Sequence, residues 1–102
     1  MSGGFFDYQQ YRFEDMADQL DKLIARSGLP IEYDDDFDPK FAPTHHHAFP
    51  EDILARFREA VHELRRVGEM TQRVDWLVSG DDGEDTFRRL WSEGVRPRFP
   101  IE

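Results

Sequence analysis

Apolar residues recur every three or four positions along most of this chain, a spacing that predicts helices rather than strands. The most regular run lies within residues 50–79, where the steps alternate between four and three over more than three heptads. Its members, which we call the apolar seam, are Ile53, Phe57, Ala60, Leu64, Val67, Thr71, Val74 and Val78. A seam with this repeat faces another helix in bundles and coiled coils. We therefore expect one long helix over residues 50–79, with Pro50 at its first position.

Two shorter helices are predicted on either side of the long one. The helix over 12–27 places apolar side chains at Phe13, Met16, Ala17, Leu20, Leu23 and Ile24. Gly28 and Pro30 then stand where a helix would end. A final helix over 84–94 has Phe87, Leu90 and Trp91 on one face. We expect an all-α fold, in which the first helix and the long helix form an antiparallel hairpin and the last helix folds back.

The long helix is too long for the first helix to cover. About 28 residues span roughly 42 Å at 1.5 Å per residue, nearly twice the length of the first helix. The rest of the seam must meet the last helix, the N-terminal arm or a second chain, and we expect a homodimer through the long helix. Gly68 lies beside the seam, where close approach of a neighbouring backbone would explain a glycine.

Two segments outside the helices have distinct compositions. Rings crowd the N-terminal arm at Phe5, Phe6, Tyr8, Tyr11 and Phe13. We expect the arm to pack across the helices, with an exposed aromatic partner site as the alternative. Residues 29–49 form an acidic, proline-containing linker whose apolar residues follow no regular spacing. The linker either wraps the fold or is mobile. All 102 residues are expected to form one domain, 1–102.

Composition excludes several classes of function. The chain has no cysteine, so disulfides, thiolate metal sites and cysteine nucleophiles are excluded. No apolar run approaches the ~20 residues that a membrane helix requires, and we expect a cytoplasmic protein with no membrane contact. The net charge of −9 repels phosphates, so direct nucleic acid binding is not expected. A protein with a basic surface is the natural partner.

The stretch WLVSGDDGED, residues 76–85, combines an apolar run, a break and a cluster of acids. A phosphate-binding loop requires a lysine, and this stretch has acids in its place, which repel phosphate. The stretch is therefore not expected to be such a loop. We predict a structural joint instead, made by Ser79, Gly80, Asp81 and Glu84. Gly80 would end the long helix in a left-handed conformation, and Asp81 would cap the next helix with Glu84 three residues on. Asp82 with Asp85 is a second possible register.

Metal sites are weakly supported. Asp34, Asp36 and Asp38 match positions 1, 3 and 5 of a calcium-binding EF-hand loop. Pro39 and His45 occupy positions 6 and 12, which require Gly and Glu. The run His45, His46 and His47 is a second candidate, and adjacent histidines rarely all face one ion. His62 and Glu63 begin like a zinc-protease helix motif, but Arg66 stands where it requires a histidine. We expect no cofactor, and a metal-dependent enzyme built on the histidines is the most remote hypothesis.

No spacing in the chain pairs a nucleophile with a base and an orienting acid, so we expect no enzyme. The arginines of the long helix alternate with acids, which is typical of a solvated face with i, i+4 ion pairs. Trp76 is unusual because the heptad count points it away from the seam. We expect the last helix to return over it, by way of Phe87, Leu90 and Trp91, or a partner to cover it.

The opening MSGGFFDY and the later VDWLVSGDDGEDTFRRLW resemble a family of small uncharacterised phage and prophage proteins. That family combines an MSGG start, followed by aromatics, with a tryptophan-bearing SGD-x-GED stretch. The two motifs cover about a quarter of the chain, and the linker DDDFDPKFAPTHHH is not part of the pattern. The resemblance implies a phage-related origin and a small accessory protein that acts on host machinery, with no activity to transfer.

These observations favour a non-enzymatic protein that binds another protein. A sharper hypothesis is an anti-CRISPR-like inhibitor of a host defence or nucleic-acid-handling complex. Its acids would occupy a basic surface that normally receives phosphates. The candidate contacts are Asp34, Asp35, Asp36, Asp38, Trp76, Asp81 and Asp82. The alternative is a structural, homodimeric phage component that pairs through the uncovered seam.

Overall fold

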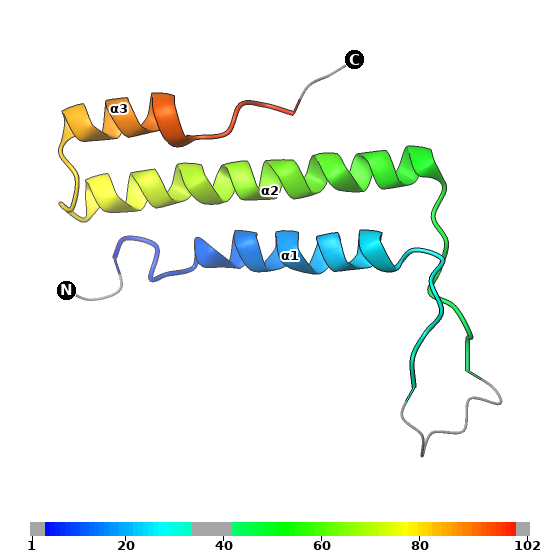
Figure 1. Cartoon of the computed structure of the whole chain (residues 1–102). Helices are drawn as coiled ribbons and strands as arrows, with labels where there is room; N and C mark the ends of the chain where they lie inside the picture. The colour runs from blue at the N-terminus through cyan, green and yellow to red at the C-terminus, as the bar shows by residue number, and fades with distance from the viewer. Residues whose placement is uncertain (1–3, 34–41, 100–102) are drawn as a thin grey trace.

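The computed structural model describes residues 4–33 and 42–99 and contains three helices. They are α1 (Tyr11–Arg26), α2 (Glu51–Val78) and α3 (Glu84–Gly94). The helix α2 lies in the middle, with α1 along one side and α3 along the other (Figure 1). The all-α hairpin with a short C-terminal helix is confirmed, and each helix boundary falls within one residue of its predicted position.

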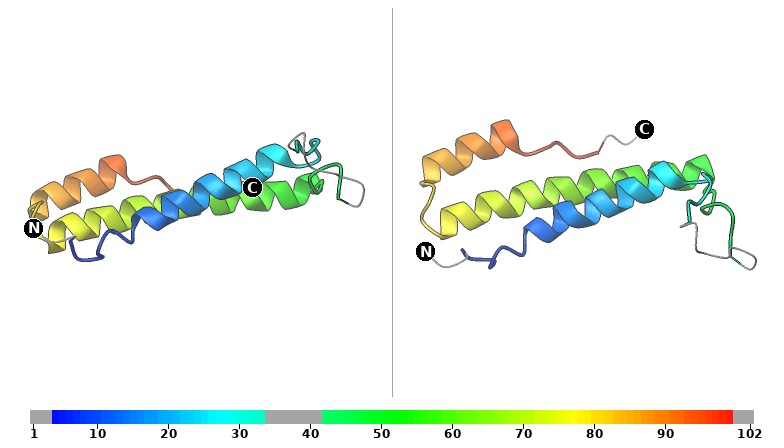
Figure 2. Two further views of the ribbon diagram at one scale, coloured as in Figure 1. Left: turned by 90° about the horizontal axis from the view of Figure 1, so that it is seen from below. Right: turned by 60° about the horizontal axis from the view of Figure 1, so that its bottom comes forward.

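The helices form a layer that is one helix thick. The molecule measures 60 × 39 × 14 Å, and a single helix with its side chains is roughly 10–12 Å across. Figure 2 shows the three helices edge-on. The radius of gyration is 19.0 Å, against about 13 Å for a compact chain of this length. Among the described residues, the buried apolar side chains are those of Ala17 and Val61 alone.

The helix α2 meets α1 and the arm through a row of polar and small residues. We call this row the polar stripe; it consists of Arg65, Gly68, Gln72, Asp75 and Ser79, and each of them has a contact with α1 or the arm. The stripe has the same four-and-three spacing as the apolar seam but lies one residue further along. One residue is a rotation of about 100° around a helix.

The expectation that α1 packs on the apolar seam is therefore wrong. Ile53 and Val78 remain 38% and 53% exposed, and Ala60 is exposed too. Two features of the polar stripe explain the rotation. Gly68 and the fully buried Ala17 have little or no side chain and let the helices approach closely. Arg65 reaches three carboxylates of α1, which no seam residue can do.

Gly68 tests how tightly α1 and α2 are packed. A Cβ built there would lie 3.5 Å from the Cβ of Phe13, an ordinary contact, although the backbone oxygen of Gln10 is only 4.0 Å away. Alanine also removes the cost of glycine inside a helix, so Gly68→Ala should raise the free energy of unfolding by roughly 0.5–1 kcal/mol. Urea titration measures this change. A loss of stability would contradict the described separation of the helices.

The far side of α2 is occupied by α3 and the extended segment after it. Arg66 donates to the backbone oxygen of Arg96 at 2.9 Å, and Glu69 accepts from the amide of Arg96 at 3.1 Å. Further along, Glu63 accepts from the amide of Phe99 at 3.2 Å. The backbone of residues 95–99 therefore runs along α2, as Figure 1 shows, and side chains of α2 hold it by these hydrogen bonds.

The described ends of the linker between α1 and α2 pair with each other. The amide of Ile31 donates to the oxygen of Thr44, and that of His46 donates to the oxygen of Leu29. Gly28 has the expected left-handed backbone, with φ of 75°, and its amide binds the oxygen of His47. Pro50 is the N-cap of α2 rather than its first helical residue.

Candidate binding site at the aromatic end

The N-terminal arm lies against the C-terminal end of α2. The amide of Phe5 donates to Oγ of Ser79 at 3.1 Å, and the amide of Phe6 donates to Oδ1 of Asp75 at 3.1 Å. In Figure 1 the arm continues the line of α1 towards the turn that follows α2. The aromatic opening of the chain and its later SGD motif, 74 residues apart at Phe5 and Ser79, therefore meet in space.

Gly4 and Asp75 fix the path of the arm. Gly4 has φ of 79°, and a Cβ there would lie 2.6 Å from Oδ1 of Asp75. Only glycine meets both demands, because the left-handed backbone disfavours side chains and the carboxylate fills the space. Asp75 is 5% exposed, and a buried carboxylate is costly without donors. The arm therefore supplies a backbone donor that this acid requires.

Three rings at the N-terminal end of the chain are exposed, although the backbone of the arm is held. Phe5, Tyr8 and Tyr11 are 61%, 59% and 50% exposed, and Val78 at the end of α2 is 53% exposed. Tyr8 and Tyr11 stack with centroids 6.3 Å apart. We call these four residues the aromatic end. The arm contacts the helices, as expected, through hydrogen bonds of its backbone and through the ring of Phe6, which lines a groove with Phe13 and Thr71.

The turn after α2 is the predicted joint. Gly80 has φ of 86°, its amide binds the oxygen of Leu77 at 3.2 Å, and the amide of Asp81 binds the oxygen of Trp76 at 2.8 Å. This pair of bonds is a Schellman motif. Gly80 therefore ends the helix as predicted, and Ser79 additionally binds the arm.

The predicted capping box at Asp81 and Glu84 is wrong, and so is the second register at Asp82. The N-cap of α3 is Gly83, without a side-chain cap. The amides of Asp81 and Asp82 both bind the oxygen of Trp76 at the end of α2, so α3 begins only after Gly83. Glu84 instead lies 3.5 Å from Arg88, and Asp82 lies 3.9 Å from Arg73.

The conformation of Gly80 sets the cost of replacing it. Its surroundings are open, because a methyl group added at its Cα would meet nothing within 4 Å. Only the backbone opposes a side chain, and an L-residue in the left-handed region costs roughly 1–2 kcal/mol. Gly80→Ala should therefore lower the free energy of unfolding by about that amount. Thermal unfolding followed by circular dichroism measures it, and Gly83→Ala, with φ of −83° and equally open surroundings, is the control.

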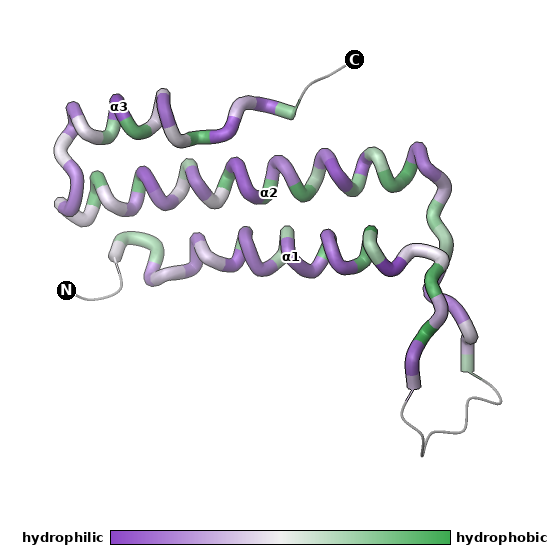
Figure 3. Tube along the Cα trace, viewed as in Figure 1, coloured by the Kyte–Doolittle hydropathy of each residue, from purple (hydrophilic) through white to green (hydrophobic). Residues whose placement is uncertain are grey.

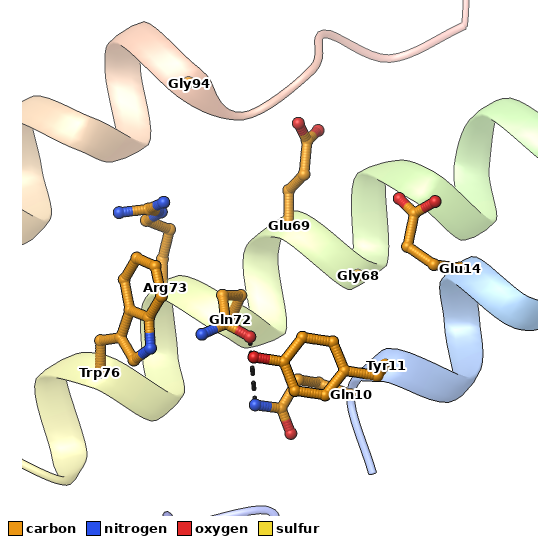
Figure 4. Close-up of a pocket in the computed structure, with 9 residues that line it drawn as sticks. All are labelled: Gln10, Tyr11, Glu14, Gly68, Glu69, Gln72, Arg73, Trp76 and Gly94. Atoms are coloured by element: carbon orange, nitrogen blue, oxygen red, sulfur yellow. Dashed lines mark hydrogen bonds between the residues drawn. The ribbon is translucent and has the colours of Figure 1, made fainter. Parts of the chain in front are cut away.

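Trp76 lines a groove of about 290 Å³ on one face of the layer (Figure 4). The guanidinium of Arg73 lies over its ring, 4.4 Å from the centroid. Among the described residues, no ring of α3 stacks on Trp76; Phe87 and Trp91 pack on each other at 5.4 Å. The groove is lined by Gln10, Tyr11, Glu14, Gly68, Glu69, Gln72, Arg73, Trp76 and Gly94. The ring contact that the described structure gives Trp76 is therefore the cation–π contact with Arg73.

Two amides meet at the base of this groove. Nε2 of Gln10 donates to Oε1 of Gln72 at 3.1 Å, drawn as the dashed line in Figure 4. Gln10 is only 3% exposed. A buried amide fixes the orientation of a side chain because its hydrogen bonds are lost if it rotates. The pair therefore anchors the start of α1, next to Tyr11, against α2.

Arg65 collects three acids of α1. Its guanidinium binds Asp21 at 2.6 Å, Asp18 at 3.1 Å and also Glu14. The hydrogen bond with Asp21, followed by those with Asp18 and Glu14, raises the pKa of Arg65 above its already high value. The arginine is thus charged throughout the physiological pH range. Sequence reasoning missed Arg65 and Asp75, although the heptad spacing of the polar stripe was visible.

The remaining predicted site residues are dispersed. Asp34, Asp35, Asp36 and Asp38 lie outside the described residues. The histidines point to different neighbours: the ring of His45 bonds with Oγ1 of Thr44, and that of His47 packs on Phe49 at 4.5 Å. Within residues 4–33 and 42–99, no three histidine or acidic side chains are grouped so that they could hold a metal ion.

The chain matches no protein-family model, no curated protein and no solved structure. In the part of the chain that the structure describes, no helix has both the length and the apolar character needed to cross a membrane.

Proposed function

We propose that this protein is non-enzymatic and acts by binding another protein through the aromatic end. One observation carries the proposal: Phe5, Tyr8 and Tyr11 are at least half exposed although the backbone beside them is fixed by Asp75 and Ser79. A mobile arm could expose its rings by chance. An arm that is held by two side chains of α2 presents them in one arrangement.

This arrangement suits protein recognition. Aromatic side chains bury a large area for few rotatable bonds, and they are enriched among the residues that dominate binding energy. Ordering them before binding lowers the entropy cost of association. Trp76, whose ring is stacked under Arg73, lies in the adjoining groove with Tyr11. The aromatic end and this groove together form a surface with apolar, cationic and acidic parts.

The specific form of the proposal is a cytoplasmic, phage-type accessory protein that inhibits a host defence or nucleic-acid-handling complex. The net charge of −9 supports a partner with a basic surface. Asp81 is exposed beside the aromatic end. Asp34, Asp35, Asp36 and Asp38 follow the other end of α1 in the sequence and are proposed as separate contacts with the same partner. The acids would occupy a surface that normally receives phosphates.

Affinity capture from a bacterial lysate, followed by mass spectrometry, tests the proposal when paired variants are used. The double variant Phe5→Ser/Tyr8→Ser should lose the captured protein, with roughly a hundredfold weaker binding if each ring contributes about 1.4 kcal/mol. Leu29→Ser is the control, because Leu29 is 51% exposed but follows the opposite end of α1. Equal capture by all three proteins would refute a role for the aromatic end.

The acidic form of the proposal has its own test. Replacing Asp34, Asp35, Asp36 and Asp38 by asparagine should weaken capture at low salt and leave it less sensitive to added salt. Unchanged capture at low salt would remove the phosphate-mimicking mechanism and leave binding by the aromatic end intact.

A further inference from the structure

We propose that a second copy of this chain covers the apolar face of the layer. This face consists of the apolar seam of α2 and a parallel row on α1. The row on α1 is made by Phe13, Met16, Leu20 and Leu23, which follow one another by three and four residues. Figure 3 shows that hydrophobic positions recur along the whole of α2 and not at one end only.

Contacts place the two rows on the same side of the layer. Phe13 and Met16 of α1 line an apolar groove of about 320 Å³ together with Thr71 of the seam. The acids Glu14, Asp18 and Asp21 lie on the opposite side of α1, where they meet Arg65. One face of the layer is therefore apolar and the other carries the ion pairs.

The apolar face is incompletely covered. Met16 and Leu23 are 44% and 42% exposed, and Ile53 and Val78 at the two ends of the seam are 38% and 53% exposed. The other described segments pack on different faces of α2. The helix α1 packs on the polar stripe, and α3 with its following segment lies along the far side of α2. The exposed face extends over most of the length of α2.

The surface area fits a dimer. The chain exposes 7785 Å², whereas a compact monomer of 12.1 kDa exposes roughly 6,000 Å². The excess is roughly 1,750 Å² per chain. Burying half of that excess on each of two copies would create an interface of standard size, about 1,600 Å² in total. Stacking two layers would also create the core that one layer of 14 Å cannot contain.

A second copy fits this face better than an unrelated chain. The face is a long row of similar small and medium apolar residues, so it is complementary to itself under a two-fold rotation. Each copy carries a charge of −9, yet the acids bound to Arg65 would lie on the outer faces of the pair. Phe5, Tyr8 and Tyr11 are not members of this face, and Val78 alone belongs both to it and to the aromatic end, so Ala60→Glu tests the dimer without changing the aromatic end.

Sedimentation velocity on the full chain at about 5–200 µM, with two matched variants, tests this proposal. The wild-type protein should sediment as a species of twice 12.1 kDa at the higher concentrations. Ala60→Glu adds a charge at an exposed position in the middle of the seam, and should weaken dimerisation at least tenfold. Ala25→Glu makes the same change at an exposed position of α1 outside the apolar row, and should dimerise as the wild type does.

Helicity, followed by circular dichroism on the same samples, separates loss of pairing from loss of fold. If Ala60→Glu is both monomeric and unfolded, Met16→Gln provides the second test, because a neutral change at a half-exposed position should weaken pairing and leave helicity unchanged at high concentration. A wild-type monomer at about 200 µM would overturn the proposal. So would a dimer equally stable in Ala60→Glu and Ala25→Glu, since it would use another face.

Discussion

Replacing Arg65 by methionine is expected to lower the free energy of unfolding by about 1–3 kcal/mol. An exposed ion pair contributes only ~0.2–1 kcal/mol, but Arg65 makes three at once and its side chain is 22% exposed. Its removal leaves Glu14, Asp18 and Asp21 one turn apart on α1, and like charges at that spacing repel. Methionine keeps the apolar part of the side chain, so the loss of stability measures the contribution of the charged guanidinium group.

Arg58→Met is the matched control for this prediction. Arg58 pairs with Glu51 alone at 2.7 Å, and both side chains are largely exposed. Its replacement should change the free energy of unfolding by less than about 0.5 kcal/mol. Urea titrations at low salt and in about 1 M NaCl should show the Arg65 effect shrinking with salt. Equal losses in the two variants would contradict the assignment of Arg65 as the main link between α1 and α2.

Replacing Asp75 by alanine should have the second large effect, a loss of about 1–3 kcal/mol. The amide of Phe6 loses a hydrogen bond to a charged acceptor, and such a bond contributes about 1.5–3 kcal/mol. The arm should also come away from α2, because Ser79 alone then remains to hold Phe5. The free energy of unfolding measures the first effect, and limited proteolysis within residues 4–10 measures the second.

Asp81→Ala makes the same chemical change at an exposed residue of the adjoining turn. It should alter the free energy of unfolding by less than about 0.5 kcal/mol and leave the arm protected from protease. If Asp81→Ala and Asp75→Ala behave alike, the arm is not held by Asp75. If Asp75→Ala also abolishes capture of the partner, the fixed arrangement of the rings is required for binding.

The helices were predictable from the sequence because the signals for them are local. The four-and-three spacing identified all three helices, and Gly28 and Gly80 both adopt the left-handed conformation that their positions indicated. The Schellman motif at Gly80 follows from a glycine at the end of a periodic run. Such features depend on neighbours within one turn, so one sequence contains the information.

The face of α2 on which α1 packs was not predictable in the same way. Hydrophobicity indicated the apolar seam, whereas α1 packs one residue away on the polar stripe. This choice depends on pairs that are distant in sequence, such as Arg65 with Asp21 and Gln72 with Gln10. A single sequence does not indicate which charges will pair. It therefore identified the faces of the helix but not the face that α1 would use.

The candidate site was predicted in pieces. The aromatic arm and Trp76 were each noted as possible partner contacts, but nothing in the sequence joined them. The link is Asp75, which resembled one more solvated acid of a charged helix and is 5% exposed in the structure. Its position in the spacing Arg65, Gly68, Gln72, Asp75, Ser79 was the available signal. A polar heptad beside an apolar one indicates a second packing surface.

Hydrogen exchange at the amides of Phe5 and Phe6, followed by nuclear magnetic resonance, tests most directly whether α2 fixes the aromatic arm. Both amides should exchange more than about tenfold slower than in an unstructured peptide, because each is bonded to a side chain of α2. In Asp75→Ala the protection of Phe6 should disappear. Exchange of both amides at the unstructured rate in the wild-type protein would contradict a fixed aromatic end.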